Sequence, residues 1–422
     1  MLSLFMKLTV DNFAFIKHAD IAIDGITVIT GDNNSGKSTV GKILYSIFFA
    51  LNGIDKKIEK QRRSAIIEKA QNLIHGLGDI LMQYYLNPLT EHFEQLIINE
   101  HGKVDIKWDE ILKVYAKKVP VLTDRNKQEE IECALYHIQN IPRENLINDH
   151  LMSVFGDIFN GQVISLMSDS KNAHVNLEIK QQQIDIDFQS NDSCSCVAPF
   201  SLLNKSILYN SPMVVDLLTA RGVQDTPMRN LARMLSQYRE RRVNEEDLFQ
   251  KSLLKDKLDY VIVSLNKVVP GTICKEGRNF AIKQERFSSA LNLSNLSTGV
   301  KAFLVLRMLI DSNQLKERDV IILDEPEIHL HPTWQLVYAE LIVLLQKEFD
   351  LSVVVTTHSN FFMDAIETYT KKYQTYEKLH LYLSELGSDG VNIIDVTNNS
   401  EAIYSKMADA LDVLDSERLS QD

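Results

Sequence analysis

Alternating and wholly apolar runs along the chain predict several strands. Residues 174–189 and 379–396 each hold two alternating runs around a polar centre, which is typical of a hairpin. We expect the first hairpin to turn at Gln181–Gln183 and the second at Gly387–Gly390. The runs expected to form single strands are 4–13, 19–30 and 206–209.

Apolar residues at intervals of three and four predict helices elsewhere. Between Ile66 and Tyr84 such residues form one stripe, which predicts an amphipathic helix. No heptad repeat is sustained, so we expect no extended coiled-coil arm. From Phe280 the pattern runs strand, loop, helix, strand, helix, strand, which indicates α/β architecture. The remaining helical patterns cover 37–51, several segments up to about residue 159, 226–240, 245–269 and the tail from residue 400.

Composition narrows the class of protein. The chain has 422 residues and a formal charge of 45 − 57 = −12, which disfavours a general nucleic-acid coat but leaves a local basic groove open. No stretch reaches the about 18 apolar residues of a membrane helix. The four cysteines, Cys133, Cys194, Cys196 and Cys274, form no CxxC pair. We therefore expect a reduced, cytoplasmic setting and interpret the cysteines as structural.

One loop carries a complete phosphate-binding motif. The stretch ITVITGDNNSGKST runs from an apolar strand into a helix and contains Gly31-x-x-x-x-Gly36-Lys37-Ser38. Glycines let the backbone wrap closely around a phosphate, and amides at the helix start point at the anion. We expect Lys37 to neutralise phosphate charge and Ser38 to bind Mg²⁺. The expected ATP contacts are Gly31, Asn33, Asn34, Ser35, Gly36, Lys37, Ser38 and Thr39.

A second apolar strand, DVIILDE, ends in two acids. A phosphate-binding loop needs an acid at the tip of a neighbouring strand to hold Mg²⁺, and parallel strands expose their carboxyl ends at one edge of a sheet. We therefore expect Asp324 to complete the metal site with Ser38. Glu325, one residue further, is expected to orient or deprotonate the attacking water.

Two shorter motifs flank these acids. Leu296-Ser297-x-Gly299 precedes a helix, where it forms either an ordinary helix cap or a second anion cradle. Another buried strand, LSVVVTT, leads into His358, which is well placed to sense the terminal phosphate. The order of the four motifs along the chain favours the functional interpretation of each.

The segments GDNNSGKST, NLSTGVKAF, VIILDEPEIHLHP and VVVTTHS together resemble ABC-type ATPases of the SMC-like, non-transporter branch. The chain is more closely similar to the compact ATPases related to the overcoming-lysogenisation-defect (OLD) family. Such proteins are often grouped with AAA ATPases and occur in bacterial phage-defence operons, the Septu ATPase among them. The resemblance covers 4–51 and 281–360 and implies an α/β ATPase head, a mixed core sheet flanked by helices, with a mainly helical insertion.

The resemblance also implies how the parts would act. Ser297 and Gly299 would close over ATP bound by another subunit, giving a head-to-tail dimer or a higher oligomer. His358 would be the switch histidine, and EIHLHP would replace the dimer-contact loop. The implied parts are a first ATPase lobe (1–51), a helical insertion (52–170), the rest of the first lobe with a hairpin and helical subdomain (171–270), and a second lobe (271–422).

Three features need a separate interpretation. The family's glutamine that senses Mg²⁺ and water has no assignable equivalent, because Gln181–Gln183 are expected in a turn. His329 and His331 have metal-like spacing but lack a third ligand, and we interpret them as part of the dimer-contact loop.

About 60 residues follow the last motif, too few for the nuclease domain of many OLD relatives. Asp185 and Asp187 resemble an acidic nuclease pair, but we interpret them as solvent-facing.

Two functions from different classes fit these observations. In the first, the chain is an ATP-driven switch that dimerises and regulates a partner effector, such as an HNH-type nuclease, in anti-phage defence. In the second, it is an SMC-like DNA repair or processing ATPase that binds DNA through the basic runs Lys56–Arg63 and Arg239–Arg242. We prefer to interpret these runs as solvated helix faces. A transporter ATPase is disfavoured by the DEPEIHLHP loop, and salt-dependent DNA binding would separate the first two functions.

Overall fold

The computed structural model describes residues 5–75, 90–117, 120–167, 169–197, 200–219, 226–238, 261–277 and 279–406. The chain divides into two compact units, one formed by Met1–Asn52 with Leu151–Asp422 and the other by Gly53–His150. The larger unit has a mixed α/β architecture, which confirms the predicted fold class. The assignment of four functional parts stays a prediction.

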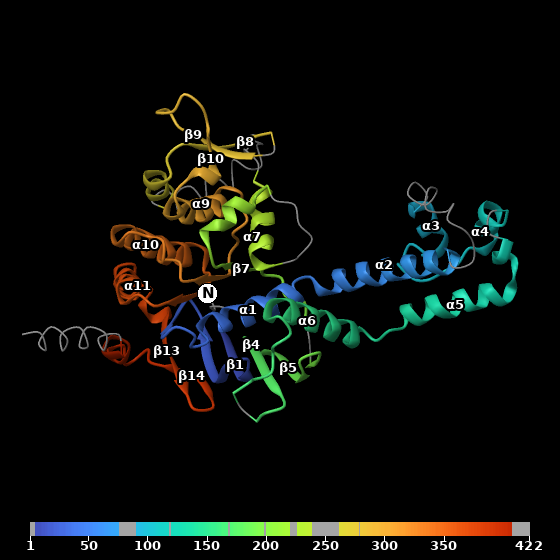
Figure 1. Cartoon of the computed structure of the whole chain (residues 1–422), viewed down its shortest axis with the longest axis horizontal. Helices are drawn as coiled ribbons and strands as arrows, with labels where there is room; N and C mark the ends of the chain where they lie inside the picture. The colour runs from blue at the N-terminus through green and yellow to red at the C-terminus, as the bar shows by residue number, and fades with distance from the viewer. Residues whose placement is uncertain are drawn as a thin grey trace, which may run out of the picture. The chain divides into compact units, whose positions relative to one another are not determined.

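A mixed sheet of eleven described strands forms the centre of the larger unit (Figure 1). Neighbours from β6 to β2 pair antiparallel, whereas β13, β3, β12, β11 and β7 run parallel and open their carboxyl ends on one edge. In spatial order the strands are β6 (Ser193–Val197), β5 (Gln182–Ser190), β4 (Ala173–Ile179), β1 (Met6–Phe13), β2 (Ile16–Ile23), β14 (Gly390–Asp395), β13 (Leu379–Gly387), β3 (Ile26–Gly31), β12 (Ser352–Thr357), β11 (Val320–Asp324) and β7 (Ser206–Tyr209).

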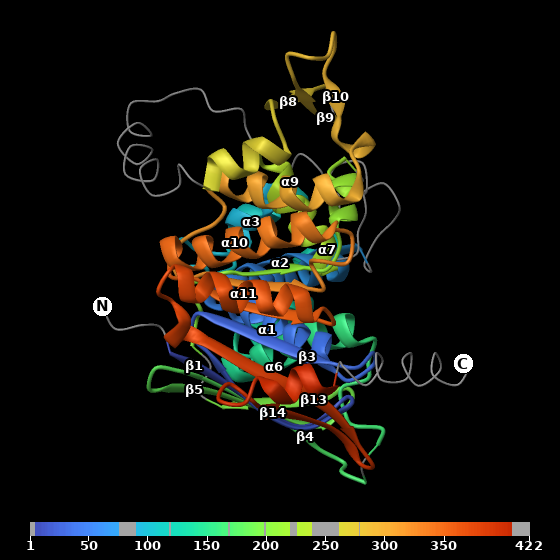
Figure 2. The same ribbon diagram turned by 90° about the vertical axis from the view of Figure 1, so that its left-hand side faces the viewer.

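Helices cover both faces of the parallel part of the sheet (Figures 1 and 2). Ile321 and Leu323 of β11 belong to a core shared with α9 (Thr298–Asp311), α10 (Pro332–Phe349) and α11 (Asn360–Lys372). Ile322 points the other way and meets α1 (Lys37–Leu51) at Gly41. This alternation with a period of two explains why the central strands are apolar throughout, since both of their faces are buried.

Smaller elements complete the larger unit. The carboxyl end of α6 (Arg143–Phe159) packs Phe155 and Phe159 against Phe13 of β1, in edge-to-face contacts. A three-stranded sheet consists of β8 (Thr272–Glu276), β9 (Asn279–Lys283) and β10 (Leu291–Asn292). The remaining elements are η3 (Pro212–Leu217), α7 (Pro227–Ser236), a helical segment at 261–268, η4 (Leu293–Asn295), η5 (Tyr376–Lys378) and a helical segment at 401–406.

The smaller unit is helical and has a core of its own. Ile66 and Ala70, from the predicted apolar stripe, are buried in it, while the part of the stripe beyond His75 lies outside the described residues. Its two longest helices that lie wholly within the unit, α2 and α5, run side by side (Figure 1). Its elements are α2 (Ile54–His75), α3 (Thr90–Ile97), α4 (Trp108–Tyr115), η2 (Pro120–Thr123), α5 (Arg125–Gln139) and the first part of α6. None of the described helices has the length and apolar content of a membrane span.

Most predicted elements are confirmed, with three corrections. The run 19–30 is not a single strand, because β2 ends at Ile23, β3 begins at Ile26, and β14 and β13 lie between them in the sheet. Gln182 already belongs to β5 and pairs with Ile179, so the first hairpin turns at Lys180–Gln181; Lys180 has the positive φ of 58° that a two-residue turn favours. The helix predicted over 226–240 is shorter, because Thr226 caps the amino end of α7 and the helix ends at Ser236. Of the helix predicted over 245–269, the part before residue 261 lies outside the described residues.

We expect Gly41→Ala to destabilise the protein by about 1–3 kcal/mol, the usual cost of overpacking a core. A Cβ at this position would lie 2.6 Å from Cγ2 of Ile322, so α1 or β11 must move. Gly156→Ala in α6 is the matched control, since its Cβ would meet no heavy atom within 4 Å and helix propensity favours Ala by about 1 kcal/mol. Thermal unfolding of both variants tests this, and a lower midpoint for Gly156→Ala than for Gly41→Ala would contradict it.

Candidate active site

Three motifs meet at the edge where β3, β12 and β11 end. These strands are parallel neighbours, so their carboxyl ends lie together. The Gly31–Thr39 loop follows β3, the two acids follow β11, and His358 follows β12. In the ladder, Asp324 lies opposite Thr356. Segments about 300 residues apart in the sequence thus form one site.

The loop after β3 has the backbone that a phosphate-binding loop requires. Gly31 and Gly36 have φ values of 141° and 77°, and Asn34 has a φ of 61°. A Cβ on Gly31 would lie 2.5 Å from the carbonyl oxygen of Ser384 on β13, so only glycine fits between the strands. The Ser384 hydroxyl also donates to the backbone carbonyl of Ser35. The neighbouring strand β13 therefore fixes the shape of the loop from outside.

Lys37, at the start of α1, is buried with 4% of its surface exposed. Its Nζ donates to the carbonyl oxygens of Asp32, at 2.6 Å, and Gly31, at 3.0 Å. Burial lowers the pKa of Lys37, and the carboxylates of Glu325 and Asp324 oppose that shift. The ammonium group is therefore held inside the loop by acceptors that a phosphate oxygen can replace.

Asp324 connects the loop helix to two strands. Its Oδ1 accepts a hydrogen bond from Oγ of Ser38 at 2.7 Å and another from Oγ1 of Thr356 at 2.5 Å. A carboxylate and a hydroxyl in contact are the hard oxygen ligands that Mg²⁺ prefers, together with phosphate oxygens. The pair Ser38 and Asp324 therefore fits a magnesium site, and Thr356 orients the acid.

Glu325 and His358 form a pair beside this acid. The distance from Nε2 of His358 to Oε1 of Glu325 is 2.8 Å, and each side chain is about 30% exposed. Glu325 has a φ of 48°, an uncommon value for a non-glycine residue, and its backbone N–H donates to the carbonyl of Thr356 at 3.1 Å. This turn directs the carboxylate away from the strand and toward the histidine. The site thus contains an acceptor for a proton and a group that orients it.

The second anion cradle lies on α9. Ser297 is the N-cap residue, is exposed, and makes no side-chain capping bond, so its hydroxyl is not used by its own helix. A Cβ on Gly299 would lie 3.1 Å from the carbonyl oxygen of His329 and 3.2 Å from the Trp334 ring, so this glycine packs against the loop after the acids. No hydrogen bond or ion pair in the described part of the chain joins the cradle to the phosphate-binding loop. His331 has a structural role, because its Nδ1 accepts from the backbone of Thr333 and caps α10.

The structure adds residues that the motifs did not single out. Thr356 hydrogen-bonds Asp324, and Ser384 hydrogen-bonds the backbone of the phosphate-binding loop. The pair of threonines in VVVTTHS was the one signal in the sequence for Thr356. The strand next to β11 is β7, which ends at Tyr209 and is followed by the exposed amide side chain of Asn210. Gln182 and Gln183 instead lie on β5, near the opposite end of the strand order.

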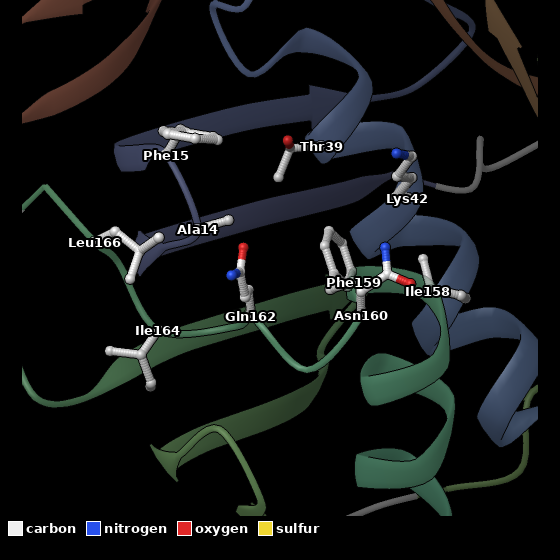
Figure 3. A pocket seen from close by; sticks show the side chains of 10 residues that line it. All are labelled: Ala14, Phe15, Thr39, Lys42, Ile158, Phe159, Asn160, Gln162, Ile164 and Leu166. Atoms are coloured by element: carbon white, nitrogen blue, oxygen red, sulfur yellow. The ribbon is translucent and has the colours of Figure 1, made fainter.

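A pocket of about 180 Å³ lies beside the first turn of α1. Figure 3 shows Thr39 and the ring of Phe15, from the turn between β1 and β2, on the same side of it, with Lys42 further along α1. Phe15 is 38% exposed, so its ring is available for a contact. Residues 158–166 form the opposite wall.

The other candidate residues are accounted for by local contacts. Asp185 and Asp187 lie on β5 on either side of His174, with oxygen to ring nitrogen distances of 3.1 and 2.9 Å, and all three are partly exposed. Cys194 and Cys196 are buried on β6, and burial raises the pKa of the Cys196 thiol to about 12, which keeps it protonated.

Comparison with known proteins gives one family match and several structural ones. A family model described as "AAA domain, putative AbiEii toxin, Type IV TA system" matches residues 170–364, which include the Ser297 cradle, the acids and His358 but not the phosphate-binding loop. That segment is therefore similar to an AAA-type domain.

Three of the structural matches are SMC heads. An SMC head bound to the C-winged helix domain of ScpA has a TM-score of 0.46 and 13% identity, over 93% of this chain and 98% of that chain. The SMC head domain from Thermotoga maritima has a TM-score of 0.38 and 14% identity, over 93% and 99%. The SMC head with an extended coiled coil bound to the C-terminal domain of ScpA, from Pyrococcus furiosus, has a TM-score of 0.43 and 13% identity, over 99% of this chain and 100% of that chain. At these values the site must be assigned from its own geometry.

We expect Lys37→Ala to weaken ATP binding at least about tenfold. The substitution removes a charged donor, and a hydrogen bond to a charged group contributes about 1.5–3 kcal/mol. Calorimetric titration with Mg·ATP measures this, with the exposed helical variant Lys60→Ala as the control. An affinity for Lys37→Ala close to that of the control would place the phosphates elsewhere.

Proposed function

We propose that this chain binds Mg·ATP at the Gly31–Thr39 loop and hydrolyses it to ADP and phosphate. The contact between Ser38 and Asp324, with the Glu325–His358 pair beside it, is the observation that carries the proposal. A loop alone could bind any phosphate, and an acid pair alone could cap a helix. Their meeting at one sheet edge brings together a phosphate cradle, a metal ligand and a base.

Each residue of the site has a defined part in this reaction. Ser38 and Asp324 would hold Mg²⁺, which would neutralise charge on the phosphate oxygens when bound. Lys37 exchanges its carbonyl partners for phosphate oxygens. Glu325 accepts the proton of the attacking water, and His358 holds the Glu325 carboxylate in place and lies close to the terminal phosphate. Hydrolysis thus depends on positioning and charge more than on covalent chemistry.

The pocket beside α1 is the place for the nucleoside. Thr39 belongs both to the phosphate-binding loop and to the wall of this pocket, so a nucleotide with its phosphates at Lys37 reaches it directly. The exposed ring of Phe15 offers a flat apolar surface for a base. This arrangement supports a nucleotide, in preference to inorganic phosphate or a phosphoprotein, as the ligand.

We propose further that ATP holds two copies head to tail. The hydroxyl of Ser297 makes no capping bond to its own helix, so the amino end of α9 is available for the terminal phosphate of ATP bound by a second copy. Gly299 packs closely against the loop after the acids. Two large apolar side chains, Ile328 after the acids and Phe361 after His358, are 64% and 44% exposed close in sequence to the catalytic pair. Apolar side chains at such positions favour burial by a partner surface.

The proposed role of this ATP-dependent dimer is to regulate an effector, in particular a nuclease of the HNH type, in anti-phage defence. This part of the proposal is supported by the motif resemblance. Direct DNA binding is the weaker candidate. In the run Lys56–Arg63, Arg62 donates to the carbonyl of Ile141 and Arg63 pairs with Glu94, so two of its cations are already engaged. The run Arg239–Arg242 lies outside the described residues.

We expect Glu325→Gln to keep ATP binding and to lower hydrolysis about 100-fold or more, the usual scale for loss of a positioned base. The amide keeps the shape of the side chain but cannot accept a proton. Single-turnover hydrolysis measured beside ATP affinity tests this, with the exposed Glu317→Gln as the control. Unchanged turnover would move the base elsewhere, with His358 as the next candidate.

Mixing two inactive variants tests the head-to-tail arrangement. Lys37→Ala removes the loop cation, and Ser297→Arg blocks the cradle. A mixed dimer contains one site with an intact loop and an intact cradle, so we expect ATPase activity to recover to about one quarter of wild type for random pairing. Wild-type activity in Ser297→Arg alone would exclude a cradle that acts on the neighbouring subunit.

A further inference from the structure

Glu327 is a buried carboxyl group that the proposed reaction does not use. It follows Pro326 in the turn after the acids and is 5% exposed. Burial raises the pKa of Glu327, while hydrogen bonding from Thr357 and from the backbone amides of Glu327 and His358 opposes that shift. No donor in the described part of the chain lies within hydrogen-bond distance of its second oxygen, Oε2. A buried acid with an unpaired oxygen costs stability, so its presence needs an explanation.

The contacts of Glu327 converge on the segment that carries His358. The hydroxyl of Thr357, itself completely buried, donates to Oε1 of Glu327. The same hydroxyl oxygen accepts the backbone N–H of Ser359 at 2.9 Å. Through the Thr357 hydroxyl, Glu327 therefore acts on both residues that flank the histidine.

The backbone of Glu327 is also held in place by its neighbours. Its backbone carbonyl accepts the N–H of Leu330 at 2.8 Å and lies 3.5 Å from the side-chain nitrogen of Gln335 on α10. Its position is two residues after Glu325. One side chain thus bridges the turn that directs Glu325 and the strand end that presents His358.

We propose that Glu327 is a positioning residue that holds His358 at hydrogen-bond distance from Glu325 and so sets the rate of hydrolysis, not the affinity for nucleotide. This inference rests on the proposed ATPase function. A carboxylate suits the task because Thr357, the last residue of β12, presents a hydroxyl donor to it, and an ionised acceptor makes the stronger hydrogen bond. A glutamine keeps one acceptor oxygen but carries no charge, so its hydrogen bond with the Thr357 hydroxyl is weaker. A leucine would pack well but would leave the Thr357 hydroxyl without its acceptor.

The test compares Glu327→Gln, Thr357→Val and His358→Ala, alone and combined, in the full chain. We expect Glu327→Gln to lower kcat about 10- to 100-fold, the range for a misplaced catalytic group, with the Kd for Mg·ATP changed less than about twofold. Thr357→Val, which removes only the hydroxyl, should act in the same direction. In the His358→Ala background neither substitution should lower kcat further, because the group that they position is gone.

Glu367→Gln is the matched control. Glu367 is a second buried glutamate, 9% exposed, on the helix that follows His358, and it pairs with Lys371 at 2.6 Å. We expect this variant to keep the kcat of the wild type. Thermal unfolding of every variant identifies chains that do not fold, and Thr357→Val keeps the test decisive if Glu327→Gln is among them.

The possible results separate this inference from the function on which it rests. A wild-type chain that binds but does not hydrolyse ATP would overturn the proposed ATPase and this inference with it. Hydrolysis by the wild type with an unchanged kcat in both Glu327→Gln and Thr357→Val would overturn the inference alone. It is equally overturned if His358→Ala leaves kcat unchanged, or if Glu327→Gln lowers kcat by the same factor with and without His358, which would be a merely structural effect.

Discussion

The site depends on one carboxylate oxygen, Oδ1 of Asp324, which accepts hydrogen bonds from Ser38 on α1 and Thr356 on β12. Hydrogen bonds to an ionised acceptor are shorter and stronger than those between neutral groups. This atom therefore joins three elements, two of which lie far from the first in the sequence: the helix after the phosphate-binding loop, the strand that ends in the two acids, and the strand that leads to His358. Its partners can meet only because β3, β12 and β11 are parallel neighbours in that order. A different strand order would leave the same motifs apart.

The residues of the loop and the acids could be found from the sequence because each motif lies within one short segment. The glycines at 31 and 36 and the lysine that follows have a spacing set by local backbone geometry, and the structure gives both glycines positive φ values. Ser384 could not be found in this way. It reaches the loop from β13, about 350 residues later, and its importance arises only from the pairing of Ser384 with Gly31. Contacts of this kind depend on strand order and register, which local patterns do not specify.

The error at the first predicted hairpin has a related cause. Three consecutive glutamines look like a turn because they are polar, but a strand with one solvent-exposed face accepts polar residues, and the pairing of Ile179 with Gln182 leaves only Lys180 and Gln181 in the turn. The edge strand β7 shows the opposite case. Its four residues were predicted, yet its place beside β11, and hence the position of Asn210 after the carboxyl end of a strand next to β11, appears only in the sheet order. Short motifs identify candidate site residues, and the order of the strands in the sheet decides which of them lie in the same site.

The charge of the site bears on how an acidic chain would bind ATP, the proposed ligand. The net charge of −12 would repel ATP at long range, so the attraction would have to be local. Lys37 is the cation of the loop, and it lies among Glu325, Asp324, Asp32 and Glu327, whose carboxylates favour its charged form. Without a metal, the terminal phosphate would meet more negative than positive charge. A divalent cation held by Ser38 and Asp324 would add two positive charges and largely offset that excess where the proposed phosphate oxygens would lie. The same acids that would oppose free ATP would thus favour a nucleotide that carries its metal, and the proposed base, Glu325, is one of them.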